Sequence, residues 1–272
     1  MFARVSSSEH RTIIEFCCGE ESLLGKLADK NCTVHRVTIE NDVTTPEGMA
    51  HVLKLIENCN PHRTLLFASM PCTGGSPWMN LNRRYPGGAA KLRIHLRIFK
   101  RIWSCFAKCA MLLKSLGGHI CIECPTACAY WRWKCVENLV EMLGLKSVKV
   151  HGCALGLKSV VNSMPIKKPW TLKTDVPTIV EELEKYKCPG DHEHHPCAGK
   201  DTKLTESYTP EMVAVIHGSF KQFLSKERLA VKHQHVNAAA AIVLKKIPTK
   251  NVLPHVCSHN MPSFCSNQVA AC

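Results

Sequence analysis

Two short segments place a cysteine and a carboxylic acid where strands are predicted to end. Residues 65–68 are apolar and are followed by "SMPCTGGS", which is typical of a buried strand that stops at Pro71 and Cys72. Further along, "GGHICIECP" is strand-like and ends in proline just after Glu123. A thiolate with a carboxylic acid beside it suits nucleophilic catalysis with proton donation. The alternative for Cys72 is a structural thiol, because free cysteine is among the most buried residue types.

The surroundings of these two side chains decide whether they can react near neutral pH. A cysteine ionises there only with positive charge nearby, which Arg83 and Arg84 in the following loop, or Lys167 and Lys168, could supply. Glu123 is flanked by apolar residues and cysteines. Burial is therefore expected to raise its pKa and to let it donate a proton near neutrality.

Two earlier strand ends carry residues suited to a nucleoside cofactor. In "EFCCGEESLLG", a turn at Gly19 lets backbone amides approach a ligand, whereas Glu20 and Glu21 disfavour a pyrophosphate and tolerate a cofactor with an ammonium and a sulfonium. In "IENDV", Glu40 is suited to bind ribose hydroxyls and Asp42 to reach an adenine amino group. An ordinary strand–helix turn and a solvated acidic turn stay open as alternatives.

The elements that must position these residues predict a doubly wound α/β fold with a mainly parallel sheet. Strand-like runs at 12–17, 33–39, 64–69 and 119–124 alternate with helical patterns, of which the longest covers 90–116. Such alternation gives parallel strands joined by right-handed crossovers. Their carboxyl ends then share one edge of the sheet, where open α/β sheets bind their ligands.

These motifs, in this order, resemble a known family. "EFCCGE", "IEND", "PCT" and "IECP" are similar to motifs of the S-adenosylmethionine-dependent DNA (cytosine-5)-methyltransferases, most of all the short, divergent domains of phages and retroelements. The resemblance covers about residues 12–175 and implies a Rossmann-like class I methyltransferase fold. We therefore predict a methyltransferase-like catalytic domain at 1–175, a Cys/His-rich loop and closing helix at 176–228, and an irregular or disordered tail at 229–272.

The resemblance also implies roles for single residues. Cys72 would attack carbon 6 of a flipped cytosine, and Glu123 would protonate ring nitrogen 3 while carbon 5 takes the methyl group. S-adenosylmethionine would be bound by the residues that match the cofactor motifs and by the proline of the Pro-Cys loop, namely Glu15, Gly19, Glu40, Asp42 and Pro71.

The chain departs from the family pattern at several positions. Glu21 replaces the second glycine of the cofactor loop, and Cys124 and Pro125 replace an Asn-Val pair. No Gln-x-Arg-x-Arg motif is present, and Lys167 and Lys168 are the only basic residues near its expected place. A large target-recognition domain has no room. The alternative is therefore a catalytically dead or non-enzymatic nucleic-acid-binding module on the same fold.

The charge of the chain favours a polyanionic partner. Lys and Arg total 35 against 22 Asp and Glu, a formal charge of +13, so we expect DNA as the partner, with RNA as an open alternative. The expected contacts are basic, with Trp78 open either to stacking on an extruded base or to packing under its loop. The predicted nucleic-acid-binding residues are Arg83, Arg84, Lys167 and Lys168.

Targeting signals and cysteine usage predict an intracellular protein. "MFARVSSSEHRT" lacks a secretory h-region, and no apolar run is long enough to cross a bilayer. The 17 cysteines are odd in number and many fall inside predicted strands and helices, which indicates free thiols in a reducing compartment. We expect no membrane partner, a nuclear location if the source is a eukaryote, and a monomer by default.

One loop carries a possible metal motif. The segment "CPGDHEHHPC" offers thiol and imidazole ligands of the types that zinc prefers, although they crowd into one short stretch. A polar loop without metal that touches a nucleic-acid backbone is the alternative. The predicted zinc ligands are Cys188, His192, His194 and Cys197.

Overall fold

The computed structural model describes residues 10–245, without the side chains of Asn80, Leu204 and residues 231–245. The chain divides into two units, Met1–Arg228 and Leu229–Cys272. The sheet, the helices that cover it up to Arg228 and the site described below belong to the first unit. Among the described helices, none is both long enough and apolar enough to cross a membrane.

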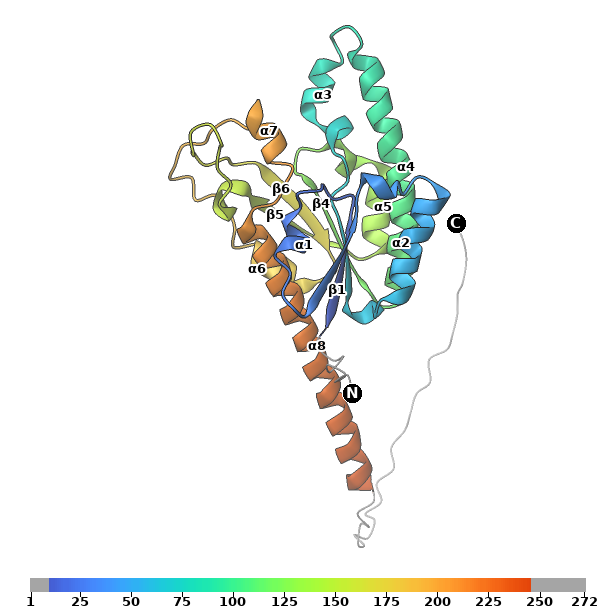
Figure 1. Cartoon of the computed structure of the whole chain (residues 1–272). Coiled ribbons are helices and arrows are strands. Elements are labelled where there is room, and N and C mark those ends of the chain that lie inside the picture. Colours follow the sequence, from blue (N-terminus) through green and yellow to red (C-terminus); the bar gives the residue numbers. More distant parts are fainter. Residues whose placement is uncertain (1–9, 246–272) are drawn as a thin grey trace, which may run out of the picture. The chain divides into compact units, whose positions relative to one another are not determined.

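A six-stranded sheet forms the centre of the first unit, in the order β2-β1-β3-β4-β6-β5 (Figure 1). The first four strands in this order are parallel to one another, whereas β6 is antiparallel to both β4 and β5. The strands are β1 (Arg11–Phe16), β2 (Cys32–Val37), β3 (Thr64–Ala68), β4 (His119–Pro125), β5 (Lys146–His151) and β6 (Pro169–Thr174).

The α/β class is thus confirmed, and the sheet is mixed because of the route between its last two strands. A parallel neighbour needs a crossover that carries the chain back to the opposite edge. Residues 152–168 hold only a one-turn 3-10 helix, η5 (Gly152–Leu155), and an isolated bridge between Lys158 and Pro165. The chain therefore re-enters the sheet at the same end of the strands where β5 stops, and β6 runs antiparallel to β5.

Helices cover both faces of the sheet, and the alternation of strand side chains separates two cores. In β3, Leu66 and Ala68 pack into one core and Leu65 and Phe67 into the other, as the period of two requires. One face carries α2 (Pro46–Asn58), α4 (Gly88–Ser115) and α5 (Lys134–Met142), and the other carries α1 (Leu23–Lys26), α6 (Pro177–Leu183) and α8 (Pro210–Lys245).

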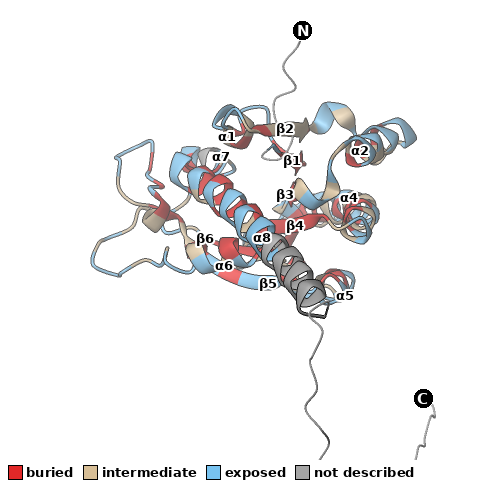
Figure 2. Cartoon of the chain, turned by 90° about the horizontal axis from the view of Figure 1, so that it is seen from below, coloured by how far each residue is buried: buried red, intermediate tan, exposed pale blue. Residues whose placement is uncertain are grey.

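Residues 176–228, predicted as a Cys/His-rich loop and closing helix after the catalytic domain, belong to the same unit as the sheet. Ile179 of α6 and Met212, Ile216 and Phe220 of α8 are fully buried against the sheet. Buried and exposed residues alternate along the described part of α8 at helical spacing (Figure 2). These residues close the second core, so the fold does not end near residue 175.

The tail predicted to be irregular from residue 229 is helical at its start, because α8 continues to Lys245. The stretch "VNAAAAIVLK" holds four consecutive alanines, the residue of highest helix propensity, and that preference outweighs its lack of amphipathic spacing. The rest of the predicted tail, 246–272, lies outside the described residues.

Candidate active site

A cavity of about 500 Å³ opens at the carboxyl ends of β1, β3 and β4. The loops that follow these three strands form its floor and walls, and Lys168 and Trp170 at the start of β6 close one side. Lys203 of α7 (Lys200–Leu204) and residues 205–208, between α7 and α8, also line it. The cavity therefore lies at the edge where the sequence predicts the chemistry.

Cys72 and Glu123 both line this cavity. Strands β3 and β4 are parallel neighbours with Ala68 beside Ile122, so the loop after one strand lies against the end of the other. The glycines of "CTGGS" allow the close approach, because a Cβ on Gly75 would collide with the Cys128 sulfur. The two glycines are therefore needed because a side chain at either position would collide with Cys128 or Tyr130.

Glu123 is buried and carries a proton over part of the neutral range. Tyr208 donates a hydrogen bond of 2.7 Å to its Oε2 atom, while Oε1 has no partner within the described residues. Ser69 lies 2.6 Å from the Tyr208 hydroxyl and donates to it, because the phenol proton is already used. Burial raises the pKa of Glu123 to about 7, against the lowering effect of Tyr208. The carboxyl group is therefore suited to donate a proton near neutral pH, as its apolar neighbours predict.

The surroundings of the Cys72 thiol lower its pKa and so ease its ionisation. A hydrogen bond with the Cys124 thiol lowers the pKa of Cys72, and the nearby Lys168 charge lowers it further. Burial and the Glu123 carboxylate act in the opposite direction. A thiolate and an ionised carboxylate in the same cavity would repel each other. When Glu123 keeps its proton, the pair carries a single negative charge, which can lie on the Cys72 sulfur.

The positive charge near Cys72 comes from Lys168 and not from the arginines considered as an alternative. Lys168 lines the cavity, and its Nζ donates to the Thr205 carbonyl oxygen. Arg83 and Arg84 are exposed at the end of α3 (Pro77–Asn82) and do not line the cavity. Lys167, predicted to act together with Lys168, also lies outside the lining.

The wall formed by the β1 end carries a buried carboxylate that faces the cavity. Ser22 donates to Glu15 Oε1, whereas Oε2 is buried without a partner among the described atoms. Burial raises the pKa of Glu15, against the hydrogen bond from Ser22 and the charge of Arg36. Arg36 holds the turn in place by donating to the Gly19 and Glu20 carbonyl oxygens at 2.6 and 2.5 Å. A Cβ added to Gly19 would meet no atom within 4 Å, so the turn leaves room for a ligand.

The second predicted cofactor segment is not part of the cavity. Glu40 and Asp42 are exposed on and just after η1 (Ile39–Asn41), and neither lines the cavity. The Asp42 carboxylate accepts hydrogen bonds from the Thr44 amide at 3.0 Å and hydroxyl at 2.8 Å. It thus ties the turn that leads into α2. Strand β2 lies at one edge of the sheet, and β1 separates it from β3, the strand that leads to Cys72.

Sequence reasoning missed Tyr208, Cys124 and Ser69 as site residues. Tyr208 reaches Glu123 from 85 positions along the chain, which no local pattern reports. The sequence signal was the "SYTP" segment, which places Tyr208 directly before the Thr-Pro start of a helix, where it lines the cavity.

Replacing Tyr208 by phenylalanine is expected to raise the pKa of Glu123 further. The hydrogen bond from the phenol favours the ionised carboxylate, so its loss favours the protonated form. The ring can still pack edge-on against Phe67, whose centroid lies 5.6 Å away. Carboxyl titration by infrared or ¹³C NMR measures the change, with the half-buried Tyr186→Phe as the control that leaves the titration unchanged. An unchanged or lower pKa in the Tyr208 variant would contradict the assignment.

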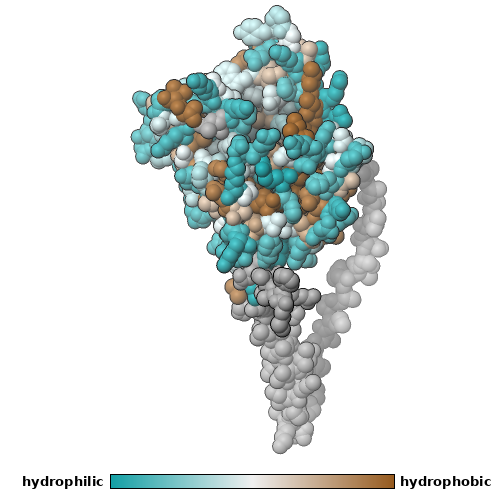
Figure 3. Space-filling view, in the orientation of Figure 1, coloured by the Kyte–Doolittle hydropathy of each residue, from teal (hydrophilic) through white to brown (hydrophobic). Residues whose placement is uncertain are grey.

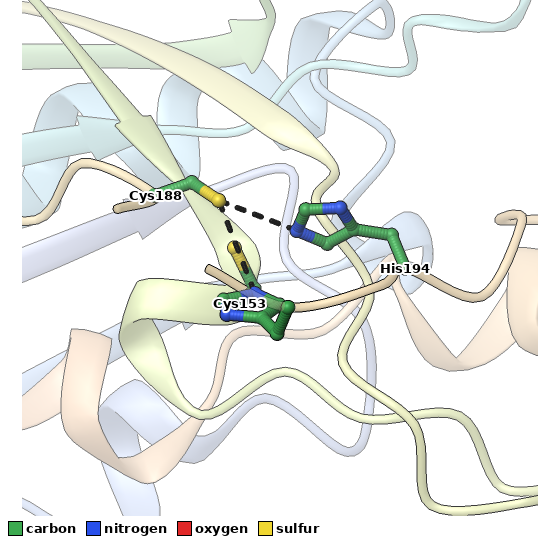
Figure 4. Close-up of side chains that lie close together, drawn as sticks. Cys153, Cys188 and His194 are labelled. Atoms are coloured by element: carbon green, nitrogen blue, oxygen red, sulfur yellow. Dashed lines mark hydrogen bonds between the residues drawn. The ribbon is translucent and has the colours of Figure 1, made fainter. Parts of the chain in front are cut away.

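The predicted zinc residues gather at a second place, with one exchange of ligand (Figure 4). Cys188, His192 and His194 converge with Cys153, which follows β5, and not with Cys197. The Cys197 sulfur lies instead 3.2 Å from the Thr205 hydroxyl. The predicted ligand set is therefore wrong at Cys197. Cys188 and Cys197 lie only nine residues apart in the sequence, but their side chains contact different parts of the chain.

Comparisons with known proteins identify no relative of this chain. No protein-family model matches the chain, and no curated protein and no solved structure is significantly similar to it. The function of the chain is therefore inferred from the geometry of the cavity.

Proposed function

We propose that this chain transfers a methyl group from S-adenosylmethionine to carbon 5 of cytosine in DNA. The observation that carries the proposal is the pairing of Cys72 and Glu123 in one cavity, with opposite shifts of pKa. A lowered thiol pKa and a raised carboxyl pKa are the shifts that a nucleophile and a general acid need at the same pH.

The chain's own residues account for the activation of the pyrimidine ring. The Cys72 thiolate forms a bond to carbon 6, and the electron pair displaced through the ring is taken up at nitrogen 3 as Glu123 delivers its proton there. Carbon 5 becomes nucleophilic as a result. Bound S-adenosylmethionine would supply the electrophilic methyl group. A base then removes the carbon 5 proton, the bond to sulfur breaks, and Cys72 leaves as thiolate while nitrogen 3 returns its proton to the Glu123 carboxylate.

The β1 wall of the cavity fits the cofactor at its amino-acid end. The buried Oε2 atom of Glu15 has no partner among the described residues, so a ligand ammonium would satisfy it. The open turn at Gly19 leaves room for the rest of the group. Glu40 and Asp42, the two residues predicted for the nucleoside end, do not line the cavity. The fit therefore rests on Glu15 and Gly19.

A basic helical hairpin, formed by α3 and the first half of α4, lies beside the cavity and suits the DNA backbone. The loop after Cys72 leads directly into it, and no Asp or Glu stands between Glu57 and Glu123. Hydrophilic side chains alternate with exposed apolar ones over α4 (Figure 3). Trp78 is 68% exposed, so packing under its loop is wrong and its ring is free to stack on a base. The exposed basic residues of the hairpin are Arg83, Arg84, Lys91, Arg93, Arg97, Lys100 and Arg101.

Replacing Arg83 and Arg84 together by alanine is expected to weaken DNA binding about tenfold near 100 mM salt. Each arginine that contacts a phosphate adds about one unit to the slope of log affinity against log salt, so the slope should fall by about 2. Fluorescence anisotropy with a labelled duplex at several salt concentrations measures both quantities. The double variant Lys54→Ala/Lys146→Ala removes the same charge from exposed positions elsewhere and should leave the slope unchanged. An equal loss in both variants would mean that only net charge matters.

The direct test of the proposal is methyl transfer from labelled S-adenosylmethionine to cytosine-containing DNA. Formation of 5-methylcytosine, identified by mass spectrometry of the digested DNA, supports it. The second candidate, a nucleic-acid-binding module without turnover, is favoured by the position of Glu40 and Asp42 outside the cavity. Tight DNA binding with no transfer over a range of pH and DNA sequences would establish that alternative.

A further inference from the structure

We propose that Cys153, Cys188, His192 and His194 bind one structural Zn²⁺ ion that fastens the 187–199 loop to the end of β5. The four ligand atoms all lie within 4.8 Å of one another. The Cys188 sulfur is 3.3 Å from Nε2 of His194 and 3.9 Å from Nε2 of His192. Tetrahedral zinc with its usual bond lengths to sulfur and nitrogen places such atoms about 3.6 Å apart. The observed distances lie on both sides of that value.

The ligands come from two separate parts of the chain. Cys153 belongs to η5, directly after β5, and the other three residues belong to the loop after α6. Figure 4 shows the Cys153, Cys188 and His194 side chains pointing toward one another from these segments. Two thiolates and two imidazoles form a closed four-ligand set, which is typical of a structural zinc site and leaves no position for a substrate.

A carboxylate orients one of the imidazoles. Asp191 Oδ1 lies 2.8 Å from Nδ1 of His192, so this nitrogen carries the proton and donates it to the carboxylate. Nε2 is then left as a lone-pair donor facing Cys188. Carboxylates bound to the far nitrogen of a histidine ligand are the usual support of zinc-bound imidazole. The hydrogen bond between His192 and Asp191 thus favours the His192 tautomer that can bind metal through Nε2.

The loop has no buried core of its own. None of the residues from 184 to 200 is buried, and the partly buried side chains among them include the cysteine and histidine ligands. A segment without buried apolar surface cannot offset the entropy of its own ordering. Small or coreless segments of this kind are typically held by a metal or a disulfide. The convergence of four metal ligands inside such a loop therefore points to zinc as the element that orders it.

The same loop leads into the roof of the cavity. His195 lies 3.4 Å from the fully buried Asp201, which accepts hydrogen bonds from the Ser159 hydroxyl at 2.7 Å and the Val160 amide at 2.9 Å. Asp201 lies in the first turn of the short helix α7, and Lys203 and residues 205–208 after it line the cavity. Zinc at the start of this path therefore also supports the placement of Tyr208 over Glu123.

Metal analysis of the purified full chain tests the proposal without any assay of activity. We expect about one zinc per chain, and near-complete loss in the double variant Cys153→Ser/Cys188→Ser. The matched control is Cys197→Ser, which changes a cysteine of the same loop and should keep its zinc. Equal loss in the control, or no zinc in the parent protein, would overturn the proposal. So would an intact Cys153–Cys188 disulfide found by mass spectrometry.

Cobalt substitution keeps the test valid if the double variant folds poorly. The parent chain, stripped of metal with a chelator and titrated with Co²⁺, should show the intense visible bands of tetrahedral cobalt together with thiolate charge transfer. Weak bands of octahedral cobalt would overturn the assignment. Trypsin should cut the stripped protein faster at Lys187 and Lys200, which flank the loop, and added Zn²⁺ should restore its resistance. Unchanged cleavage with and without metal would contradict an ordering role.

Discussion

Replacing Cys72 by alanine is expected to abolish covalent capture of DNA that contains 5-fluorocytosine. The parent protein should form a stable adduct in the presence of S-adenosylmethionine, because fluorine at carbon 5 cannot leave as a proton and the bond to sulfur then persists. Without the thiol no bond to carbon 6 can form, so methyl transfer to ordinary cytosine should fall by a factor of about 10⁴ or more. A denaturing gel shows the adduct as a band of higher mass.

The control for this experiment is Cys135→Ala, which removes an exposed thiol from α5, on a helix that does not line the cavity. It should form the adduct as the parent does. Binding of unmodified duplex should also survive in the Cys72 variant, since the basic helical hairpin is unchanged. An adduct that forms without Cys72 would mean that another of the free thiols attacks the base, and the assigned nucleophile would be wrong.

Replacing Glu123 by glutamine is expected to slow methyl transfer by about 10²- to 10⁴-fold. Glutamine has nearly the same shape, and its carbonyl oxygen can still accept the hydrogen bond from Tyr208. It cannot deliver a proton to nitrogen 3, so the negative charge that forms on attack by Cys72 is left on the ring. A single-turnover assay with saturating DNA measures the chemical step. A rate within a factor of about three of the parent would remove Glu123 from the mechanism.

The same variant is expected to change how stability depends on pH. The pKa of Glu123 is about 7 in the folded chain, above its ordinary value of 4.5, so the native state binds this proton more tightly than the unfolded state does. The parent therefore loses stability as pH rises from 4.5 towards 7, and the loss levels off above 7. Glutamine does not titrate, so between about pH 5 and pH 8 the variant should gain about 2 to 3 kcal/mol relative to the parent.

Urea unfolding of both proteins at several pH values across this range measures the difference. Every other group titrates alike in the two chains and cancels in the comparison. A constant difference in the free energy of unfolding across this range would show that Glu123 ionises normally in the folded state. Glu123→Gln therefore separates two claims, because the stability profile tests the burial of the acid and the rate tests its use.

The sequence by itself determined the strand ends and the pairing of Cys72 with Glu123. Strand β3 is apolar from Leu65 to Ala68 and ends shortly before Pro-Cys, and β4 ends just after its glutamate. Parallel strands that are neighbours in a sheet must bring their carboxyl ends to one edge. This rule depends only on local patterns and on their order along the chain, so it places the two side chains together without knowledge of any long-range contact.

Only the tertiary structure decided which further residues join these two. Tyr208 reaches Glu123 and Cys153 joins the histidine loop because distant segments pack on the same edge of the sheet. Asp42 lies outside the cavity and ties its own turn through Thr44. Residues far apart in the chain meet where buried apolar surface brings their elements together, as α6 and α8 do beneath the cavity. That choice depends on the shape of the whole core, which no motif of a few residues contains.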